Sequence, residues 1–574
     1  MKRGYFQVRS GRLSAEYERA LKKAARTEVA AGIMKRKAGM FTENVKVRKL
    51  IAHRLGWVDI ASKMKRQIGA IEKFGDNVFK SGFKYVVLAG MGGSSLCPEL
   101  FKLVHGRHKK LKLFEVIDST DPNAIKALLR RIEIKKTLFM VASKSGGTVE
   151  TRSHEAFFIE RLRAAGVKNF GKHFVAITDK GSSLEQFARK NKYRKIFLNP
   201  SDIGGRYSAL SYFGLVPGFF AGVDLTELLT SATAMEKIIR ERTGETNPAL
   251  VLGSLMAAGA KSGVNKMTFV ASKKTAPLVP WIEQLVAEST GKQKKGVIPV
   301  ENEPPGKIDI YGKDRFFVLV KMAGEKDTIE PSLINALIKQ KFPIVEIALG
   351  SKAELGGQFL LWEAATAVAG YHLNINPFDE PNVTESKNNT SSILDAYQRM
   401  GQLPYEAPLA AWNGMSLIAV ENPRGFTMNE IADVKKLLRK YFKGLKAGKY
   451  FTVLNYFRAD RKTEQALEKI RTTVRDRTKQ VTLRGYGPRY LHSIGQLFKG
   501  GPQEGLFVVF TRAHYDKLDI PGRPFDFGKL ITAQAIGDVR ALIKRKLPAL
   551  VFTLEGDPAA GLEKFHRILK ATLR

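Results

Sequence analysis

The sequence of 574 residues contains a single cysteine, Cys97, so the chain cannot form an internal disulfide bond. A chain without disulfides fits a reducing compartment, and we expect a cytoplasmic protein. No apolar run approaches the roughly 20 residues that would span a bilayer. The basic N-terminal stretch also lacks the apolar core of a signal peptide. We therefore expect no membrane partner.

Acidic residues are scarce relative to basic ones. The 55 Asp and Glu face 95 Lys and Arg, which leaves a formal net charge of +40. A field of this sign attracts anions, including nucleic acid, acidic lipid and phosphorylated metabolites. The basic residues are spread along the chain, however, and no RNP box, zinc finger or basic zipper occurs. We expect no specific nucleic-acid partner; the charge is a diffuse basic surface or speeds the encounter with an anionic substrate.

Metal-ligand spacing is absent as well. The nine histidines and Cys97 form no cluster of the kind that holds a metal ion. We therefore expect no metal.

The pattern of apolar residues predicts an α/β protein. Residues 1–81 carry apolar positions at spacings of three and four, which indicates an N-terminal helical segment. Beyond them, short β-branched runs alternate with helical stretches, as in a parallel, doubly wound sheet. Breaks in the pattern predict two such domains, over 82–224 and 225–395, and a further C-terminal α/β domain over 396–574.

The first two α/β units look related in sequence. Residues 137–145 (TLFMVASKS) are similar to residues 267–275 (MTFVASKKT). In both, a predicted strand leads into a loop with serine and lysine. This similarity suggests that the two units are distant versions of one plan.

The loop SKSGGT at residues 143–148 follows a predicted strand and precedes a helix. At such a place, free backbone N–H groups and the helix dipole favour an anion. Ser143, Ser145 and Thr148 add hydroxyl donors. The loop predicts a cradle for one phosphate, or else only a capped helix after a glycine-rich turn. It is not a nucleotide P-loop, because the G-x-x-x-x-G-K-[ST] pattern is missing.

Two more loops have a similar character. The first, GMGGSSL (90–96), places glycines before serines at a helix start, without the spacing of a dinucleotide fingerprint. The second, GGRYSALS (204–211), presents Arg206 as a planar cation at the edge of a sheet, unless Arg206 is simply a surface residue in a turn. Both loops favour a small ligand held against the backbone.

The stretch PWIEQLVAESTGK predicts a helix that opens at its proline and ends at its glycine. Trp281, Leu285 and Glu288 lie on one face, so Glu288 faces the buried side in the last turn. A carboxylate near the negative end of a helix dipole is a better base. The alternative is an exposed glutamate accompanied by Lys292.

Taken together, these stretches resemble the glucose-6-phosphate isomerase family, also called the phosphoglucose isomerase family. GMGGSSL, SKSGGTVET, GGRYSALS and QLVAESTGK are similar to its signatures and occur in its order. NPFDEPNV (376–383) and YLHSIGQLFKGG (490–501) resemble the subgroup fused behind transaldolase in some bacteria, and we expect no transaldolase half before them in this protein. The resemblance runs from about residue 45 to the C terminus.

The resemblance implies a fold, an assembly and a reaction. The fold is two sugar isomerase (SIS) domains, and the assembly is a homodimer with a shared active site. The reaction interconverts glucose 6-phosphate and fructose 6-phosphate through an enediolate, without metal or cofactor. The substrate is thus a sugar phosphate, in keeping with the predicted phosphate cradle.

The resemblance also implies roles for individual residues. Arg206 stabilises the enediolate, and Glu288 moves the proton between C2 and C1 of the substrate. His492 helps to open the sugar ring, and in this family it typically comes from the partner subunit. The residues implied to hold the phosphate are Ser143, Lys144, Ser145 and Thr148, and those implied to line the sugar site are Gly93 and Ser94.

A second ring-opening group, a lysine near the C terminus, is implied too. The matching region is PFDFGKLITAQ (524–534), where Lys529 is the nearest candidate, although an alignment on Phe-Asp places Ala533 there. We also interpret Glu150, beside the phosphate loop, as orienting Arg152 or the backbone.

Two other interpretations of the same residues stay open. One is an isomerase of dual specificity that also accepts mannose 6-phosphate. The other is a non-catalytic sugar-phosphate sensor built from SIS domains. Glu288, Arg206 and His492 together argue against a sensor, because binding alone needs no proton-transfer base. Finally, Asp379 and Glu380 are interpreted as caps of the segment that follows them.

Overall fold

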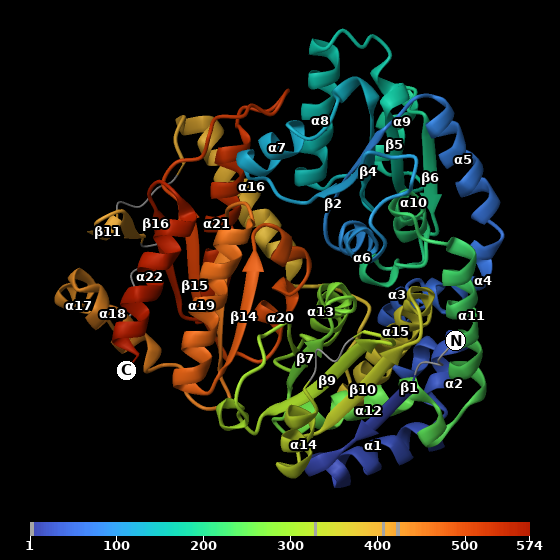
Figure 1. The fold of residues 1–574 in the computed structure, drawn as a ribbon, viewed down its shortest axis with the longest axis vertical. Helices are drawn as coiled ribbons and strands as arrows, with labels where there is room; N and C mark the ends of the chain where they lie inside the picture. The colour runs from blue at the N-terminus through green and yellow to red at the C-terminus, as the bar shows by residue number, and fades with distance from the viewer. Residues whose placement is uncertain (1–4, 326–329, 404–407, 419, 421–424, 574) are drawn as a thin grey trace.

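The computed structural model describes residues 5–325, 330–403, 408–418, 420 and 425–573. In this part of the chain the strands form three sheets, each flanked by helices, and the three units surround a common centre (Figure 1). The predicted α/β fold is therefore confirmed. The boundaries between the four predicted domains stay predictions. None of the helices described combines the length and apolar character that a membrane span requires.

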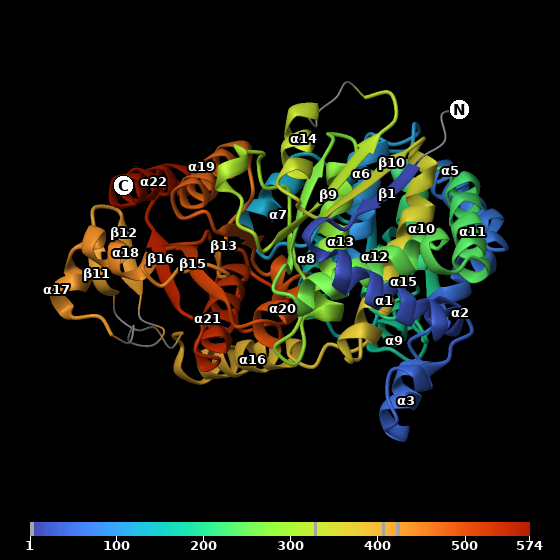
Figure 2. The same cartoon turned by 90° about the horizontal axis from the view of Figure 1, so that it is seen from below.

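The N-terminal segment is mainly helical, as predicted. It contains α1 (Ser14–Arg26), α2 (Val29–Met34), α3 (Val45–Ala52), α4 (Ile60–Lys65) and α5 (Ile68–Lys80). Figure 2 shows α3 projecting from the body of the molecule. The sequence did not reveal β1 (Tyr5–Arg9), which pairs antiparallel with β10 (Ile344–Leu349). A short strand of this kind depends on a distant partner, which local patterns do not show.

The first unit is a parallel sheet in the order β3-β2-β4-β5-β6. Strands β2 and β4 are buried along their whole length, as expected of near-continuous apolar runs covered on both faces. The strands are β2 (Tyr85–Gly90), β3 (Leu113–Ile117), β4 (Thr137–Ala142), β5 (Phe174–Asp179) and β6 (Lys195–Asn199). The helices are α6 (Leu96–His105), α7 (Pro122–Leu129), α8 (Val149–Ala164), α9 (Ser183–Lys190) and α10 (Tyr212–Ala221).

The second unit has the order β1-β10-β9-β7-β8, parallel except for β1. Its other strands are β7 (Lys266–Ala271), β8 (Ile298–Val300) and β9 (Arg315–Met322). Its helices are α11 (Leu225–Glu241), α12 (Pro248–Lys261), α13 (Val279–Thr290), α14 (Pro331–Lys339) and α15 (Leu355–Leu373).

The third unit has the order β11-β12-β16-β15-β13-β14, with an antiparallel hairpin at one edge. Its strands are β11 (Pro408–Trp412), β12 (Met415–Ile418), β13 (Tyr450–Asn455), β14 (Val481–Tyr486), β15 (Gly505–Arg512) and β16 (Ala549–Leu554). Its helices are α16 (Val383–Met400), α17 (Met428–Ala432), α18 (Val434–Phe442), α19 (Arg461–Thr478), α20 (Gly495–Gly500), α21 (Phe527–Lys544) and α22 (Pro558–Thr572).

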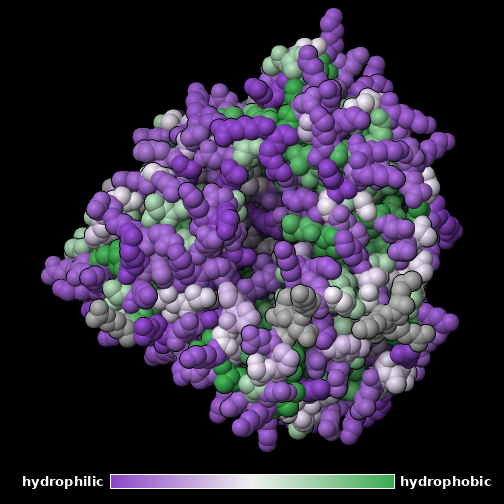
Figure 3. Space-filling view, viewed as in Figure 1, coloured by the Kyte–Doolittle hydropathy of each residue, from purple (hydrophilic) through white to green (hydrophobic). Residues whose placement is uncertain are grey.

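The parallel strands of all three units share one order. In each, the first parallel strand lies between the second and the third, and the fourth pairs with the third. The order reverses between the first and third strands, and ligands of such sheets bind outside the carboxyl ends of the strands at this point. In the first unit, the loops there are those after β2 and β4. The molecular face seen in Figure 3 is mostly hydrophilic and is hollowed where the units meet.

Candidate active site

A cavity of about 610 Å³ lies where the three units meet. Loops of the first unit form one side, and α13, α16 and the turn before α20 close the others. With the exception of Lys529, every residue that the sequence analysis placed in the site lines this cavity. These residues are Gly93, Ser94, Ser143, Lys144, Ser145, Thr148, Arg206, Glu288 and His492. The roles assigned to them remain predictions.

The loop between β4 and α8 holds its hydroxyl groups close together. The Oγ atom of Ser143 lies 3.0 Å from Oγ1 of Thr148, and it accepts a hydrogen bond of 3.1 Å from the N–H of Gly146. Thr148 is the N-cap residue of α8, but its side chain makes no cap hydrogen bond. The hydroxyls of Ser143, Ser145 and Thr148 and the start of α8 therefore face one anion-sized space.

The lysine of this loop is paired within the protein. Lys144 forms an ion pair with Asp179 and donates to the carbonyl of Ser201 at 3.1 Å. Burial raises the pKa of Asp179, although Lys144 opposes this shift. The positive charge thus stands beside the hydroxyl cradle, and Lys180 adds a second lysine to the lining of the cavity.

Gly93 is a point of close approach between two loops. A Cβ atom at this position would lie 2.0 Å from the carbonyl oxygen of Gly205. Only glycine fits this contact. This close contact places the loop after β2 against the turn Gly205–Tyr207, which carries Arg206.

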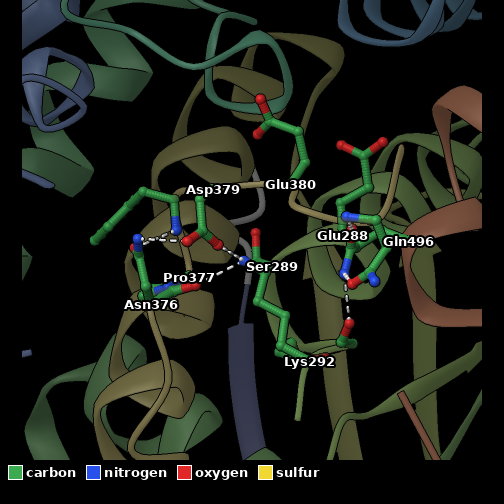
Figure 4. A network of polar contacts seen from close by, with 12 residues as sticks. Glu288, Ser289, Lys292, Asn376, Pro377, Asp379, Glu380 and Gln496 are labelled. Atoms are coloured by element: carbon green, nitrogen blue, oxygen red, sulfur yellow. Dashed lines mark hydrogen bonds and ion pairs between the residues drawn. The ribbon is translucent and has the colours of Figure 1, made fainter. Parts of the chain in front are cut away.

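Arg206 and Glu288 meet in the buried wall of the cavity. The guanidinium lies 3.6 Å from the carboxylate of Glu288 and 2.9 Å from that of Glu380. Arg206 also donates to Ser289 at 2.8 Å and to the carbonyl of Pro377 at 2.8 Å. The carboxylates of Glu288 and Glu380 point to the same side of this network (Figure 4).

Glu288 is only 7% exposed, so the predicted burial in the last turn of α13 is confirmed. Burial raises its pKa to about 8, against the opposing charge of Arg206. Lys292 is also buried, and burial lowers its pKa to about 7. It pairs with Asp379 at 3.0 Å and donates to the carbonyl of Asn376. The expected alternative, an exposed Glu288 beside Lys292, is wrong.

The sequence analysis interpreted Asp379 and Glu380 as caps of the following segment, α16. This interpretation is wrong. The N-cap residue is Asn382, which makes no side-chain cap hydrogen bond. Both acidic side chains are instead drawn to buried cations, Lys292 and Arg206. This outcome follows from the cost of leaving a buried cation unpaired.

His492 enters the cavity from the third unit of the same chain. Its Nε2 atom lies 3.3 Å from Oε1 of Glu150, and its carbonyl accepts a hydrogen bond of 2.7 Å from Gln284. Glu150 was expected to orient Arg152 or the backbone. Arg152 pairs instead with Glu155, whereas Glu150 does accept a hydrogen bond from its own backbone. Glu150 is only 3% exposed, because α8 turns it inward against the third unit. It is a partner of His492 that sequence reasoning missed.

Lys529 is the predicted site residue that lies elsewhere. It sits in the first turn of α21, with its ammonium over the ring of Tyr397. The side of α21 that meets the first unit presents Gln534, which donates to Glu150 at 2.8 Å. The lysine that reaches the cavity from the third unit is Lys387, on α16. Successive residues of a helix point in different directions, and the motif alone did not specify which of them faces the cavity.

Lys387 is one of several lining residues that the sequence analysis missed. The signal for Lys387 was its place soon after NPFDEPNV, a stretch already assigned to the family. Gln284 stands one helical turn before Glu288, where an i, i+4 neighbour shares its face. His53 and Arg54 line the cavity from the N-terminal segment, and no local pattern pointed to them.

Comparisons with known proteins identify the family of this chain. The family model described as phosphoglucose isomerase matches residues 57–314. A glucose-6-phosphate isomerase of Carboxydothermus hydrogenoformans is 30% identical over 402 residues, covering 59% of this chain and 85% of the relative. Another, of Cyanothece sp., is 29% identical over 364 residues, covering 57% of this chain and 69% of the relative.

Solved structures show the same fold. A hypothetical protein of Thermus thermophilus aligns with a TM-score of 0.58 at 24% identity, covering 68% of this chain and 99% of that one. A glucose-6-phosphate isomerase of Chlamydia trachomatis aligns with a TM-score of 0.52 at 19% identity, covering 70% of this chain and 90% of that one. From the family model and the relatives, we conclude that this chain belongs to the phosphoglucose isomerase family.

Proposed function

We propose that this chain is an aldose–ketose isomerase that interconverts glucose 6-phosphate and fructose 6-phosphate. The observation that carries the proposal is the buried pair of Glu288 and Arg206, 3.6 Å apart, in a cavity that also contains the phosphate-type loop. A proton beside a carbonyl is weakly acidic, so removing it needs a placed base and a cation for the developing oxyanion. The pair supplies both.

The loop after β4 binds the phosphate in this proposal. The hydroxyls of Ser143, Ser145 and Thr148 and the N-terminus of α8 receive the dianion, and Lys144 adds a charge beside it. Gly93 and Ser94 line the sugar between this loop and Arg206. Because the phosphate is remote from C1 and C2, its binding energy positions the reacting carbons rather than changing them.

Glu288 then transfers the proton. Its raised pKa of about 8 makes it a stronger base than an exposed carboxylate once it is deprotonated. It removes the proton from C2 of the open-chain aldose and returns it to C1, and Arg206 stabilises the enediolate between the two steps. Glu380 helps to hold Arg206 in place, at 2.9 Å.

Ring opening needs a proton at the ring oxygen and a base at the anomeric hydroxyl. We assign His492 to this step. Glu150 orients the imidazole through Nε2, at 3.3 Å, which leaves Nδ1 for the sugar. Lys387, which lines the cavity from α16, takes the second role that the sequence analysis gave to Lys529.

The proposal is tested by the variant Glu288→Gln. It should bind fructose 6-phosphate with a KM or Kd close to wild type but isomerise it roughly 1,000-fold or more slowly, since the base is gone. Exchange of the C2 proton with D2O, followed by NMR, reports the same step directly. Wild-type turnover in Glu288→Gln would exclude this residue as the base. Sugar-phosphate binding by wild type without isomerisation would favour the sensor instead.

The substrate range is the second question. Assay of mannose 6-phosphate beside glucose 6-phosphate separates strict specificity from the dual phosphoglucose/phosphomannose activity. We propose a preference for glucose 6-phosphate. Comparable kcat/KM values for the two aldoses would instead establish a dual isomerase.

The wider setting of the protein is also proposed. The motifs around residues 376–383 and 490–501 support assignment to the subgroup that occurs fused to transaldolase. The single cysteine, Cys97, supports a cytoplasmic location, which cell fractionation tests. A homodimer follows from the resemblance, and sedimentation velocity measures it. Since His492 already lies in its own chain's cavity, activity at concentrations that dissociate a dimer would show that no partner residue is needed.

A further inference from the structure

The side chain of Gln534 joins the third unit to the partner of His492. Gln534 lies on α21 and is 2% exposed. Its Nε2 atom donates to Oε1 of Glu150 at 2.8 Å, the same oxygen that lies 3.3 Å from Nε2 of His492. Its Oε1 atom accepts a hydrogen bond of 2.7 Å from the hydroxyl of Thr120. All four side chains are thus linked in one chain of hydrogen bonds.

Resting on the function proposed above, we propose that Gln534, with its amide oxygen held by Thr120, is a positioning residue that keeps Glu150 aimed at His492 as a hydrogen-bond acceptor. Gln534 is not among the residues that line the cavity, so it acts on His492 through Glu150.

Glu150 determines which way the amide of Gln534 points, because a carboxylate oxygen can only accept, so the amide N–H group faces it. The hydroxyl of Thr120 then satisfies the amide oxygen by donating to it. Thr120 is 0% exposed, so no solvent competes for this hydrogen bond. An amide turned the other way would place its oxygen against a carboxylate oxygen, which is repulsive. The buried pair therefore permits a single orientation.

The amide in turn controls the state of Glu150. Oε1 of Glu150 lies within hydrogen-bond distance of Gln534 and His492, and hydrogen bonds donated to a carboxylate favour its charged form. Burial would raise the pKa of Glu150, but the hydrogen bond and charge of His492 and the charge of Lys387 bring it below its usual value. His154, one turn along α8, also faces Glu150. A carboxylate accepts the Nε2–H group of His492, so Nδ1 of the neutral imidazole is left without a proton.

The network also crosses between units. Thr120 and Glu150 belong to the first unit, whereas Gln534 and His492 belong to the third. Correct docking of α21 against α8 therefore aligns the imidazole together with its acceptor. Such buried, fully satisfied networks specify one arrangement because each unpaired group is costly.

The test compares Gln534→Leu and Gln534→Glu with wild type. Leucine removes one donor from the carboxylate, so the pKa of Glu150 rises. Glutamate at position 534 places a second carboxyl group beside that of Glu150. Because two adjacent carboxylates repel each other, the pair holds one proton between them up to a still higher pH. Both variants should lose kcat, with KM for fructose 6-phosphate changed less than about threefold. The ratio of variant to wild-type kcat should fall as pH decreases from about 7 to about 5, because Glu150 takes up a proton at higher pH in the variants than in wild type. The titration of Glu288 is common to all of them and cancels in the ratio.

Thr532→Val is the matched control. Thr532 is on the same helix, and its hydroxyl bonds only to the carbonyl of Gly528. Its kcat ratio should stay flat with pH. Thr120→Val should act in the same direction as Gln534→Leu, and the double variant should lose less than the product of the two single losses. Additive losses, or a flat ratio for Gln534→Leu and Gln534→Glu alike, would overturn the proposal.

A readout without turnover separates this inference from the proposed reaction. In protein labelled with 15N-histidine, the His492 imidazole signals, assigned by His492→Asn, report which nitrogen carries the proton. We expect an Nε2–H form in wild type and Thr532→Val, and a mixture in Gln534→Leu. An unchanged Nε2–H form in Gln534→Leu would refute the positioning role. An inactive wild type that still shows this difference would refute only the proposed isomerase.

Discussion

At the scale of single residues, Glu288 and Lys292 lie one turn apart at the end of α13, and burial moves their pKa values toward each other. The pKa of Glu288 rises to about 8, and that of Lys292 falls to about 7. Both shifts have the same physical cause, the loss of hydration of the charged form. Arg206 opposes the shift of Glu288, and Glu380 adds to it. The base of the proposed reaction is thus set by its surroundings.

The pH dependence of activity should reflect Glu288. It acts as a base only when deprotonated, so kcat/KM should rise with pH through a midpoint of about 8. Glu380→Gln removes a like charge and frees Arg206 toward Glu288, so the midpoint should move to lower pH. The control is Glu385→Gln. The carboxylate of Glu385 pairs with Arg545 away from the cavity, so this substitution should leave the pH midpoint unchanged. A midpoint near the ordinary glutamate value in wild type would contradict this account.

Two substitutions test whether Lys387 or Lys529 is the second ring-opening group. Lys387→Ala should lower kcat for glucose 6-phosphate roughly 100-fold, because the cavity loses an acid–base group. Lys529→Ala should change it less than about twofold, since this side chain packs over Tyr397. Steady-state assays with the ring-closed sugar as substrate measure both. A larger loss for Lys529→Ala would restore the role that the motif first suggested.

At the scale of elements, the loops at the carboxyl ends of the strands are bonded to different groups in the three units. In the second unit, the loop after β7 receives the carboxylate of Glu325, which accepts from Ser272 and from the N–H of Lys274 at 3.1 Å. In the third, the backbone N–H of Arg458 donates to Asp121. The protein's own carboxylates thus satisfy these donors. The hydroxyl groups after β4 in the first unit remain open to a substrate.

The close approach of two loops at Gly93 should be sensitive to one methyl group. In Gly93→Ala, the new Cβ would lie 2.0 Å from the carbonyl of Gly205, which pushes the Arg206 turn away from Glu288. We expect kcat/KM to fall at least roughly 100-fold. The control is Gly69→Ala on α5, where a Cβ meets no atom within 4 Å. A fully active Gly93→Ala with unchanged Tm would show that the two loops can separate without cost.

At the scale of the whole molecule, the net charge of +40 surrounds a cavity that we propose binds a dianion. Long-range attraction raises the encounter rate and is screened by salt. We therefore expect kcat/KM to fall as ionic strength rises from about 0.01 to about 0.5 M, with kcat unchanged. A neutral co-solute of matched viscosity is the control. A flat profile would leave the charge as a property of the surface alone.

Much of this architecture was readable in the sequence. The runs that became β2, β4, β7, β9 and β15 were largely apolar, because strands covered on both faces exclude most polar residues. The burial of Glu288 followed from its helical spacing with Trp281 and Leu285, and the cradle at residues 143–148 from hydroxyls at a helix start. These properties are set by neighbours a few residues away.

Other features depended on the tertiary structure alone. The approach of Glu150 to His492, the exclusion of Lys529 and the entry of Lys387 all depend on how α8, α16 and α21 dock. The short strands β1 and β8 likewise exist through their partners. Sequence patterns report which face of an element is buried, because that is a local periodicity. Which distant side chain meets that face is decided by the packing of whole units, where a single turn of a helix changes the residue presented.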